Sequence, residues 1–253
     1  FKDRINSRGD TKRISSTINS ILESIHLGKL SRNPGFLFAA DFAKAFDFIE
    51  VPFLLDAFEV FGFGDYFRSL IETILTGKVG SIIGGGESFQ IFSGTGQGDP
   101  CSPLIFIIGL EILFLYAEHA NKFEKISCHI PNTNESITLP VTSAFADDNS
   151  STLALTRENI LNLLEMYNSF ELISGMRLNK EKSELICFNN TQDHLRMIQD
   201  NCNFKVVEKI KTLGFIVGSE IDIRSENLSI LKDKIRKIIG FWSKFHLSIF
   251  GRT

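Results

Sequence analysis

The sequence has few cysteines and prolines, little net charge and no long uncharged apolar run. Its four cysteines are far apart and form no CxxC pair, which argues against a zinc site and a disulfide framework and fits reduced thiols. Only 6 of its 253 residues are proline and 43% are hydrophobic, which is typical of a folded chain. The longest apolar run, Pro103 to Ala117, contains Glu111 and is shorter than the roughly 20 residues of a membrane span. We therefore expect an intracellular protein that does not enter a membrane, in the nucleus or the cytoplasm.

The formal net charge of −3 is the sum of unequal segments. Residues 1–35 carry a net charge of +4, residues 36–204 carry −12, and residues 205–253 carry +5. An acidic middle between basic ends suits cations at the centre and a polyanion at the flanks. A mixed, solvated surface explains the same pattern, so charge alone does not separate the two interpretations.

Hydrophobic periodicity predicts helices and short strands that interleave without the strict alternation of a parallel sheet. The expected helices cover about 14–27, 52–61, 65–76, 103–120, 158–172 and 225–242. The expected strands cover 36–40, 184–188 and 212–217, with strand pairs over 79–92 and 137–155. This order favours an α+β fold with an antiparallel sheet.

Three carboxylates occupy positions that suit metal binding. Asp41 follows a short apolar run that reads as a buried strand, and Asp147 and Asp148 lie at the expected tip of a hairpin with apolar flanks. Carboxylates from two neighbouring strands can hold two Mg²⁺ ions about 4 Å apart, which clamp the attacking and leaving oxygens of a phosphoryl transfer. An exposed turn or a helix cap is the alternative explanation for an Asp-Asp pair.

Six motifs follow one another in a recognisable order. They are residues 41–47 (DFAKAFD), 94–103 (GTGQGDPCSP), 145–148 (FADD), 175–184 (GMRLNKEKSE), 213–214 (LG) and 242–252 (WSKFHLSIFGR). Each motif is weak alone, but the ordered set over about 36–253 resembles the polymerase domain of a reverse transcriptase of a non-LTR (LINE-type) retrotransposon. The sequence departs from that family at Gly96, where Arg often precedes the Gln.

The resemblance implies a right-hand polymerase palm with an antiparallel sheet, packed helices, partial fingers and the start of a thumb. Residues 1–35 would be a remnant of the fingers, and 36–218 the palm with inserted fingers helices (about 51–92) and a primer-grip turn. Residues 219–253 would connect to and begin the thumb. We expect an excerpt of a longer polypeptide that is inactive alone, with apolar surface such as the Phe-rich 36–63 region partly exposed.

The resemblance also assigns a catalytic centre. Asp41, Asp147 and Asp148 would hold two Mg²⁺ ions, with Mn²⁺ as an alternative, assisted by the backbone carbonyl of Phe42. Lys182 would lie near the leaving pyrophosphate, with Lys180 as a close competitor.

Six further residues would contact the substrates, and three of them, Phe46, Gln97 and Gly98, have an ordinary structural explanation as well. Phe46 would lie under the sugar and exclude a 2′-hydroxyl, although a core aromatic is the alternative for one of 24 phenylalanines. Gln97 and Gly98 would lie against the nascent base pair and the template, and Phe145 against the primer end. Leu213 and Gly214 would turn the chain under the primer.

The resemblance therefore implies an RNA-directed DNA polymerase in which a primer 3′-hydroxyl attacks the α-phosphate of a dNTP. Its expected partners are an RNA template, a DNA primer, dNTP and other domains of the same polypeptide. The basic residues of the last helix suit phosphate contacts, or else form a solvated face. Two alternatives stay open: a domesticated or decayed palm that binds RNA without catalysis, and a reverse transcriptase of the group II intron maturase type.

Overall fold

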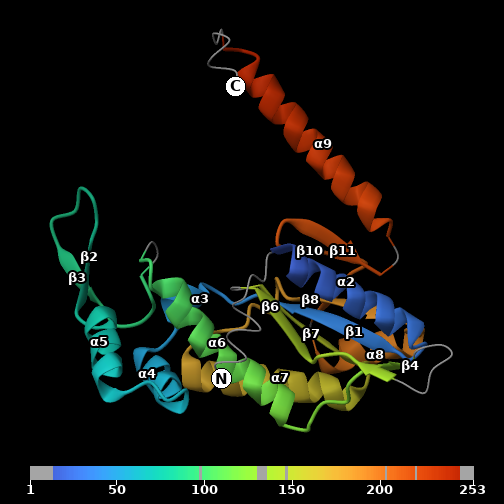
Figure 1. Ribbon diagram of the computed structural model, residues 1–253, viewed down its shortest axis with the longest axis horizontal. Helices are drawn as coiled ribbons and strands as arrows, with labels where there is room; N and C mark the ends of the chain where they lie inside the picture. Colours follow the sequence, from blue (N-terminus) through green and yellow to red (C-terminus); the bar gives the residue numbers. More distant parts are fainter. Residues whose placement is uncertain are drawn as a thin grey trace.

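The computed structural model describes residues 14–96, 99–129, 136–145, 148–202, 204–219 and 221–245, as an α+β fold (Figure 1). The helices are α2 (Ile14–Leu30), α3 (Ala45–Phe48), α4 (Val51–Val60), α5 (Asp65–Leu75), α6 (Ser102–His119), α7 (Arg157–Ser174), α8 (Gln192–Asn201) and α9 (Ile223–Trp242). The strands are β1 (Gly35–Ala40), β2 (Lys78–Ser81), β3 (Ser88–Ile91), β4 (Ser127–His129), β5 (Ser136–Thr138), β6 (Thr142–Phe145), β7 (Asp148–Ala154), β8 (Glu184–Phe188), β9 (Lys205–Val206), β10 (Lys209–Thr212) and β11 (Phe215–Gly218).

The central sheet has five strands in the order β6-β7-β1-β8-β9. All of its pairs are antiparallel except β8 with the two-residue β9. Strand β1 lies between β7 and β8, with Phe38 opposite Ser151 on one side and Leu185 on the other. A strand that is paired on both edges and covered on both faces buries every side chain, which explains the uninterrupted apolar run that ends at Asp41.

Successive residues of β1 face two different cores. Phe36 and Phe38 are fully buried in the larger cluster, to which α4, α6 and α7 contribute. Leu37 points to the smaller cluster, which joins the sheet to α2 and to the β10–β11 hairpin. The central sheet is thus covered by a helical layer on one face and by α2 with a hairpin on the other.

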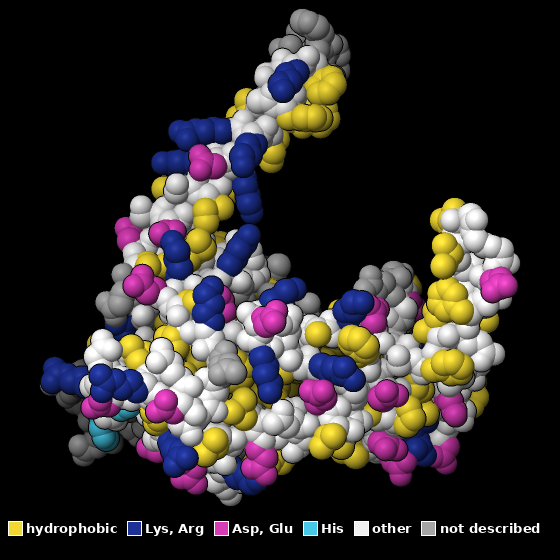
Figure 2. Space-filling model, turned by 180° about the vertical axis from the view of Figure 1, so that it is seen from behind, with side chains coloured by type: hydrophobic (Ala, Val, Ile, Leu, Met, Phe, Trp, Pro, Cys, Tyr) yellow, Lys and Arg dark blue, Asp and Glu magenta, His cyan; other side chains and the backbone are white. Residues whose placement is uncertain are grey.

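Two projections rise from this body. Figure 2 shows a wide concave surface between α9 on one side and α5 with the β2–β3 hairpin on the other. Helix α9 has no buried residue along its 20 positions. Apolar side chains such as Val79, Phe89 and Phe92 of the hairpin region are more than half exposed.

The structure corrects one predicted strand and contains two features that the sequence did not predict. A continuous strand over 212–217 is wrong, because Leu213 and Gly214 form the turn between β10 and β11. The sequence also fails to predict α8 and the β8–β9 parallel pair. The Phe-rich 36–63 region is partly exposed as predicted, at Phe48 and Val60, but most of its phenylalanines are core: Phe36, Phe38, Phe42, Phe53 and Phe58 are buried.

Helix α6 is long and apolar enough to cross a membrane by length and composition alone. In this structure it packs against α4 and α7, and eight of its residues are buried. Part of its apolar surface is therefore used for packing in the core, while Leu104 and Ile107 are exposed.

Candidate active site

The structure brings Asp41 and the start of β7 to the same edge of the sheet. The last paired residues of β1 and β7 are Ala40 and Asn149, and the next position along each strand is Asp41 and Asp148. Strand β6 pairs Phe145 with Asp148, so the chain reverses between these two residues. Asp147 lies outside the described residues, as do the side chains of Phe145 and Asp148. The backbone thus supports the predicted neighbourhood of the carboxylates.

Asp41 lines a small cavity of about 100 Å³, here called the Asp41 cavity. Its lining comes from β1, β7, the loop before β8 and the β10–β11 hairpin, and includes Asp41, Asn149, Ser150, Lys182, Lys211 and Leu213. No described residue forms an ion pair or hydrogen bond with the Asp41 carboxylate. A half-buried carboxylate without a protein partner fits a site that receives a cation, because an ionised group at such a place needs a counter-charge.

The loop 177–183 fixes the backbone around Asp41. The Asp41 amide donates to the Ser183 hydroxyl at 3.1 Å, and the Asp41 carbonyl accepts from the Asn179 amide at 2.7 Å. The Phe42 carbonyl accepts no backbone hydrogen bond from any described residue. Carboxylate and free carbonyl oxygens are the ligands that Mg²⁺ prefers, so the donor set fits the predicted ion.

The two candidate lysines face different surroundings. Lys182 lines the Asp41 cavity, and its amide donates to the Asn179 carbonyl at 3.2 Å. Lys180 lines a separate depression with Asp200 and Phe204. The geometry favours Lys182 over Lys180 as the cation near the carboxylates.

Phe46 lies where the loop that follows β3 meets α3. Its ring stacks on Phe106 with centroids 4.3 Å apart, and it is half-buried. Its carbonyl accepts a hydrogen bond from the Thr95 amide at 2.7 Å, and the Gly94 amide donates to Ile49 at 2.8 Å. Phe46 is therefore part of the core boundary and also a neighbour of the glycine-rich motif. Gln97 and Gly98 of that motif lie outside the described residues.

Lys78 at the base of the β2–β3 hairpin holds the same loop. Its ammonium donates to the Gly94 carbonyl at 2.6 Å. Partial burial lowers the pKa of Lys78, and the nearby Asp99 carboxylate opposes this effect. No motif in the sequence indicates this contact, because Lys78 lies in an otherwise unremarkable strand.

Leu213 and Gly214 form a tight turn with φ values of 50° and 82°. Positive φ at both central residues is what a two-residue type I′ hairpin requires. Leu213 lines the Asp41 cavity and also a larger groove of about 960 Å³ between α2, the hairpin and α9. The turn thus lies between the carboxylate edge and the foot of α9.

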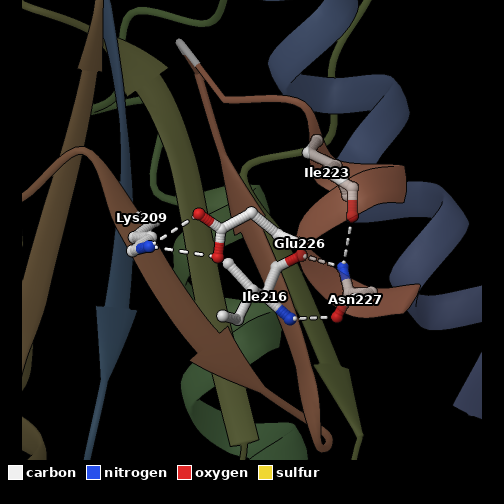
Figure 3. Close-up of polar contacts among 5 residues, drawn as sticks. All are labelled: Lys209, Ile216, Ile223, Glu226 and Asn227. Atoms are coloured by element: carbon white, nitrogen blue, oxygen red, sulfur yellow. Dashed lines mark hydrogen bonds and ion pairs between the residues drawn. The ribbon is translucent and has the colours of Figure 1, made fainter. Parts of the chain in front are cut away.

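The foot of α9 is bonded to the hairpin by one asparagine and one ion pair (Figure 3). The Asn227 amide group donates to the carbonyls of Ile216 and Ile223, each at 2.8 Å, and its oxygen accepts from the Ile216 amide at 2.8 Å. Lys209 pairs with Glu226 at 2.9 Å. The sequence has no signal for Asn227, whose partner strand is identified only by the fold.

Other metal-binding arrangements are not found among the side chains that the structure describes, since no three His, Cys, Asp or Glu residues gather there. Three of the four cysteines are buried, and only Cys101 is exposed. Burial raises the pKa of Cys187 to about 12, and Cys128 and Cys202 are also buried.

Comparisons with known proteins agree with this geometry. Residues 10–217 match the family described as reverse transcriptase (RNA-dependent DNA polymerase). Over 177 residues the chain is 30% identical to the retrovirus-related Pol polyprotein from type-1 retrotransposable element R2 of Popillia japonica, a match that covers 66% of this chain and 27% of the polyprotein. The chain therefore spans only a minor part of that relative.

Solved structures share the fold at low sequence identity. Apo telomerase from Candida tropicalis, truncated from its C-terminal domain, superposes with a TM-score of 0.51 and 11% identity, covering 79% of this chain and 38% of that one. Telomerase from Candida albicans in complex with a fragment of telomeric RNA gives a TM-score of 0.51 and 13% identity, covering 79% of this chain and 32% of that one. At these identities the likeness concerns the right-hand polymerase fold alone.

Proposed function

The chain belongs to the reverse transcriptase family, and on that basis we propose that it is the palm of an RNA-directed DNA polymerase that extends a DNA primer on an RNA template with dNTP. The observation that carries this proposal is the Asp41 carboxylate, which has no described protein partner and lies in a cavity at the edge where β1 meets β7. The likeness to the R2 polyprotein favours a non-LTR retrotransposon as the source.

The proposed chemistry follows from the residues around this cavity. Reverse transcriptases generally use divalent metal ions, which would activate the primer hydroxyl and support the leaving pyrophosphate. Asp41, Asp147, Asp148 and the Phe42 carbonyl would hold these ions. Ser183 and Asn179 keep the backbone of Asp41 in place through their hydrogen bonds. Orientation of the reacting groups contributes much of the rate in such a transfer.

Lys182 is proposed to act on the leaving group. It lines the same cavity as Asp41, which supports a place for its ammonium near the negative charge that would develop on the pyrophosphate. A cation there stabilises that charge or donates a proton to it. Lys180 faces a different depression and is not part of this proposal.

The hairpin, α9 and the concave surface would receive the template–primer duplex. Leu213 and Gly214 are proposed to support the primer strand, with Phe145, Gln97 and Gly98 near the nascent base pair. Figure 2 shows Lys and Arg side chains along α9, including the side that faces the concave surface. Lys232, Lys234 and Lys237 are exposed on α9 and suit contacts with phosphates that are independent of sequence.

Primer extension tests the proposed function directly. The complete natural polypeptide should incorporate dTTP on a poly(A) template with an oligo(dT) primer when Mg²⁺ is present, and should stop when the metal is chelated. Incorporation that is equal with and without divalent metal, or that needs no template, would contradict the proposal.

Phe46→Val is expected to admit ribonucleotides. A smaller side chain leaves room for a 2′-hydroxyl, and discrimination should fall by about 1–3 kcal/mol because a clash is removed and no attraction is added. The loss of the stack on Phe106 should also lower the free energy of unfolding by about 1–3 kcal/mol. The measurement is the ratio of rNTP to dNTP incorporation efficiency.

Phe63→Val is the matched control for Phe46→Val. Phe63 is also half-buried and stacks on another phenylalanine, Phe67, with centroids 5.1 Å apart in the inserted helices. It should lose similar stability without a change in sugar selection. An unchanged ratio in Phe46→Val would mean that Phe46 is only a core residue.

Asn227→Ala is expected to shorten the products made per binding event. Two hydrogen bonds to Ile216 that join α9 to the hairpin are lost, together with one to Ile223 within α9, each worth about 1 kcal/mol, so the helix would hold the duplex less well. Product length with a heparin trap measures this. Asn162→Ala, which removes one hydrogen bond to Lys122 elsewhere, is the control. Equal product lengths in both variants would show that the contacts of Asn227 at the foot of α9 do not help to hold the duplex.

A further inference from the structure

Tyr167 is a buried residue of α7 that lies beneath the carboxylate edge. Its side chain is 2% exposed, and its hydroxyl donates to the Asn149 side-chain oxygen at 2.8 Å. Burial raises the pKa of Tyr167, so the hydroxyl keeps its proton and stays a donor. Asn149 is itself 5% exposed and is the residue directly after Asp148. A buried asparagine requires such a partner, because an unpaired amide in the core is costly.

The ring of Tyr167 contacts the other carboxylate segment. It meets Phe38 of β1 edge to face, with centroids 5.6 Å apart, and Phe42 at 5.9 Å. Phe42 directly follows Asp41. One side chain therefore contacts the neighbour of Asp41 through its ring and the neighbour of Asp148 through its hydroxyl.

The register of the sheet makes this arrangement consequential. Asn149 is paired with Ala40 on β1 and with Ala144 on β6, so it stands where the three strands that form the site meet. It also lines the Asp41 cavity. A shift of Asn149 would move the start of β7 relative to the end of β1, and with it the spacing of the two carboxylate segments.

We propose that Tyr167 is a positioning residue that sets the spacing between Asp41 and the start of β7 at Asp148. Its hydroxyl, through Asn149, holds the start of β7, and its ring holds Phe42. This inference rests on the proposed function, because the spacing matters only if both segments bind the same ions. Removing the hydroxyl changes none of the carboxylate residues, but it allows the two segments that carry them to move apart.

Tyr167→Phe in the complete natural polypeptide tests the inference. Partners that orient metal ligands typically contribute 10- to 100-fold to affinity, so the variant should bind Mn²⁺ about 10-fold more weakly in an EPR titration. It should need correspondingly more Mg²⁺ for half-maximal primer extension, and at saturating Mg²⁺ much of the rate should return. The KM for dTTP should change little.

Asn159→Ala is the matched control. Asn159 is 1% exposed on the same helix and bonds Ala154 at the opposite end of the same strand, and also bonds Glu124. This variant should lose at least as much stability as Tyr167→Phe, since it loses more hydrogen bonds, yet keep the metal requirement. Tyr167→Phe combined with Asn149→Ala should weaken Mn²⁺ binding no more than Asn149→Ala alone, because both changes remove the same hydrogen bond between Tyr167 and Asn149.

The outcomes separate this inference from the proposed function. If the wild-type polypeptide binds Mn²⁺ and extends primers, but Tyr167→Phe has the same Mn²⁺ affinity and Mg²⁺ requirement within twofold, the positioning role is wrong. It is also wrong if Asn159→Ala shifts the metal requirement equally, since general destabilisation would then be the cause. If the wild-type polypeptide binds Mn²⁺ and Tyr167→Phe weakens this binding as expected, but the wild type does not extend primers, only the proposed function is contradicted. Absence of both Mn²⁺ binding and extension would overturn both.

Discussion

Replacing Asp41 with asparagine is expected to lower Mg²⁺-dependent primer extension by about 10³-fold or more. The change removes one negative charge from a cavity in which no described residue forms an ion pair with the Asp41 carboxylate, although Lys182 and Lys211 line the same cavity. A lost metal ligand removes several kcal/mol of stabilisation from the developing charge, and each 1.36 kcal/mol corresponds to a factor of ten in rate, so about 4 kcal/mol gives this loss. The backbone bonds of Asp41 to Ser183 and Asn179 do not involve the carboxylate, so the fold should be kept.

Asp47→Asn is the control for the loss of charge. Asp47 belongs to the same segment and is exposed on α3. Its substitution removes the same charge a short distance away, and we expect less than a threefold change in extension. Both variants are compared with wild type by steady-state dTTP incorporation and by far-ultraviolet circular dichroism. Activity of Asp41→Asn within twofold of wild type would exclude Asp41 as a metal ligand.

Gly94→Ala is expected to destabilise the protein by about 3 kcal/mol and to reduce primer extension strongly. Gly94 has a φ of 83°, and a β-carbon there would lie 2.7 Å from the Phe46 carbonyl oxygen and 2.8 Å from that of Asp47. Both neighbours are backbone atoms on α3, so relief requires the loop and α3 to separate. That movement would displace Phe46 and the motif that contains Gln97.

Gly62→Ala provides a control that isolates the close approach. Gly62 has nearly the same φ, 78°, but a β-carbon would meet no atom within 4 Å. The free energy of unfolding of this variant should fall only by the cost of placing alanine in a left-handed backbone, about 1 kcal/mol. Urea unfolding of both variants measures the difference in the free energy of unfolding. If Gly94→Ala is no less stable than Gly62→Ala, the loop does not pack on α3 as described.

Local pattern was sufficient for the elements with strong periodicity or clear end signals. Helix α7 ends where Ser174-Gly175 predicts, with Gly175 at a φ of 74°, and Pro52 lies in the first turn of α4. Strands β6 and β7 also pair on either side of the predicted hairpin tip, with Phe145 opposite Asp148. These features depend on residues that are close in the sequence.

Local pattern was insufficient where pairing is distant or an element is short. Helix α8 has a polar sequence with a single fully buried residue, Ile198, so its apolar stripe is too narrow to predict it. Strand β9 has two residues and exists through its pairing with β8. The turn at Leu213 and Gly214 was identified by resemblance, yet the strands around it were misplaced, because alternation over 209–218 does not show where the chain reverses.

The sequence by itself determined the family, the α+β class and the identity and order of the carboxylates, because these depend on residue type along the chain. Only the tertiary structure decided that Lys182 and not Lys180 shares a cavity with Asp41, and that Tyr167 contacts both carboxylate segments. The physical reason is distance along the chain. The bond between Asp41 and Ser183 joins residues 142 positions apart, and a contact of that kind leaves no periodic or local signal in one sequence.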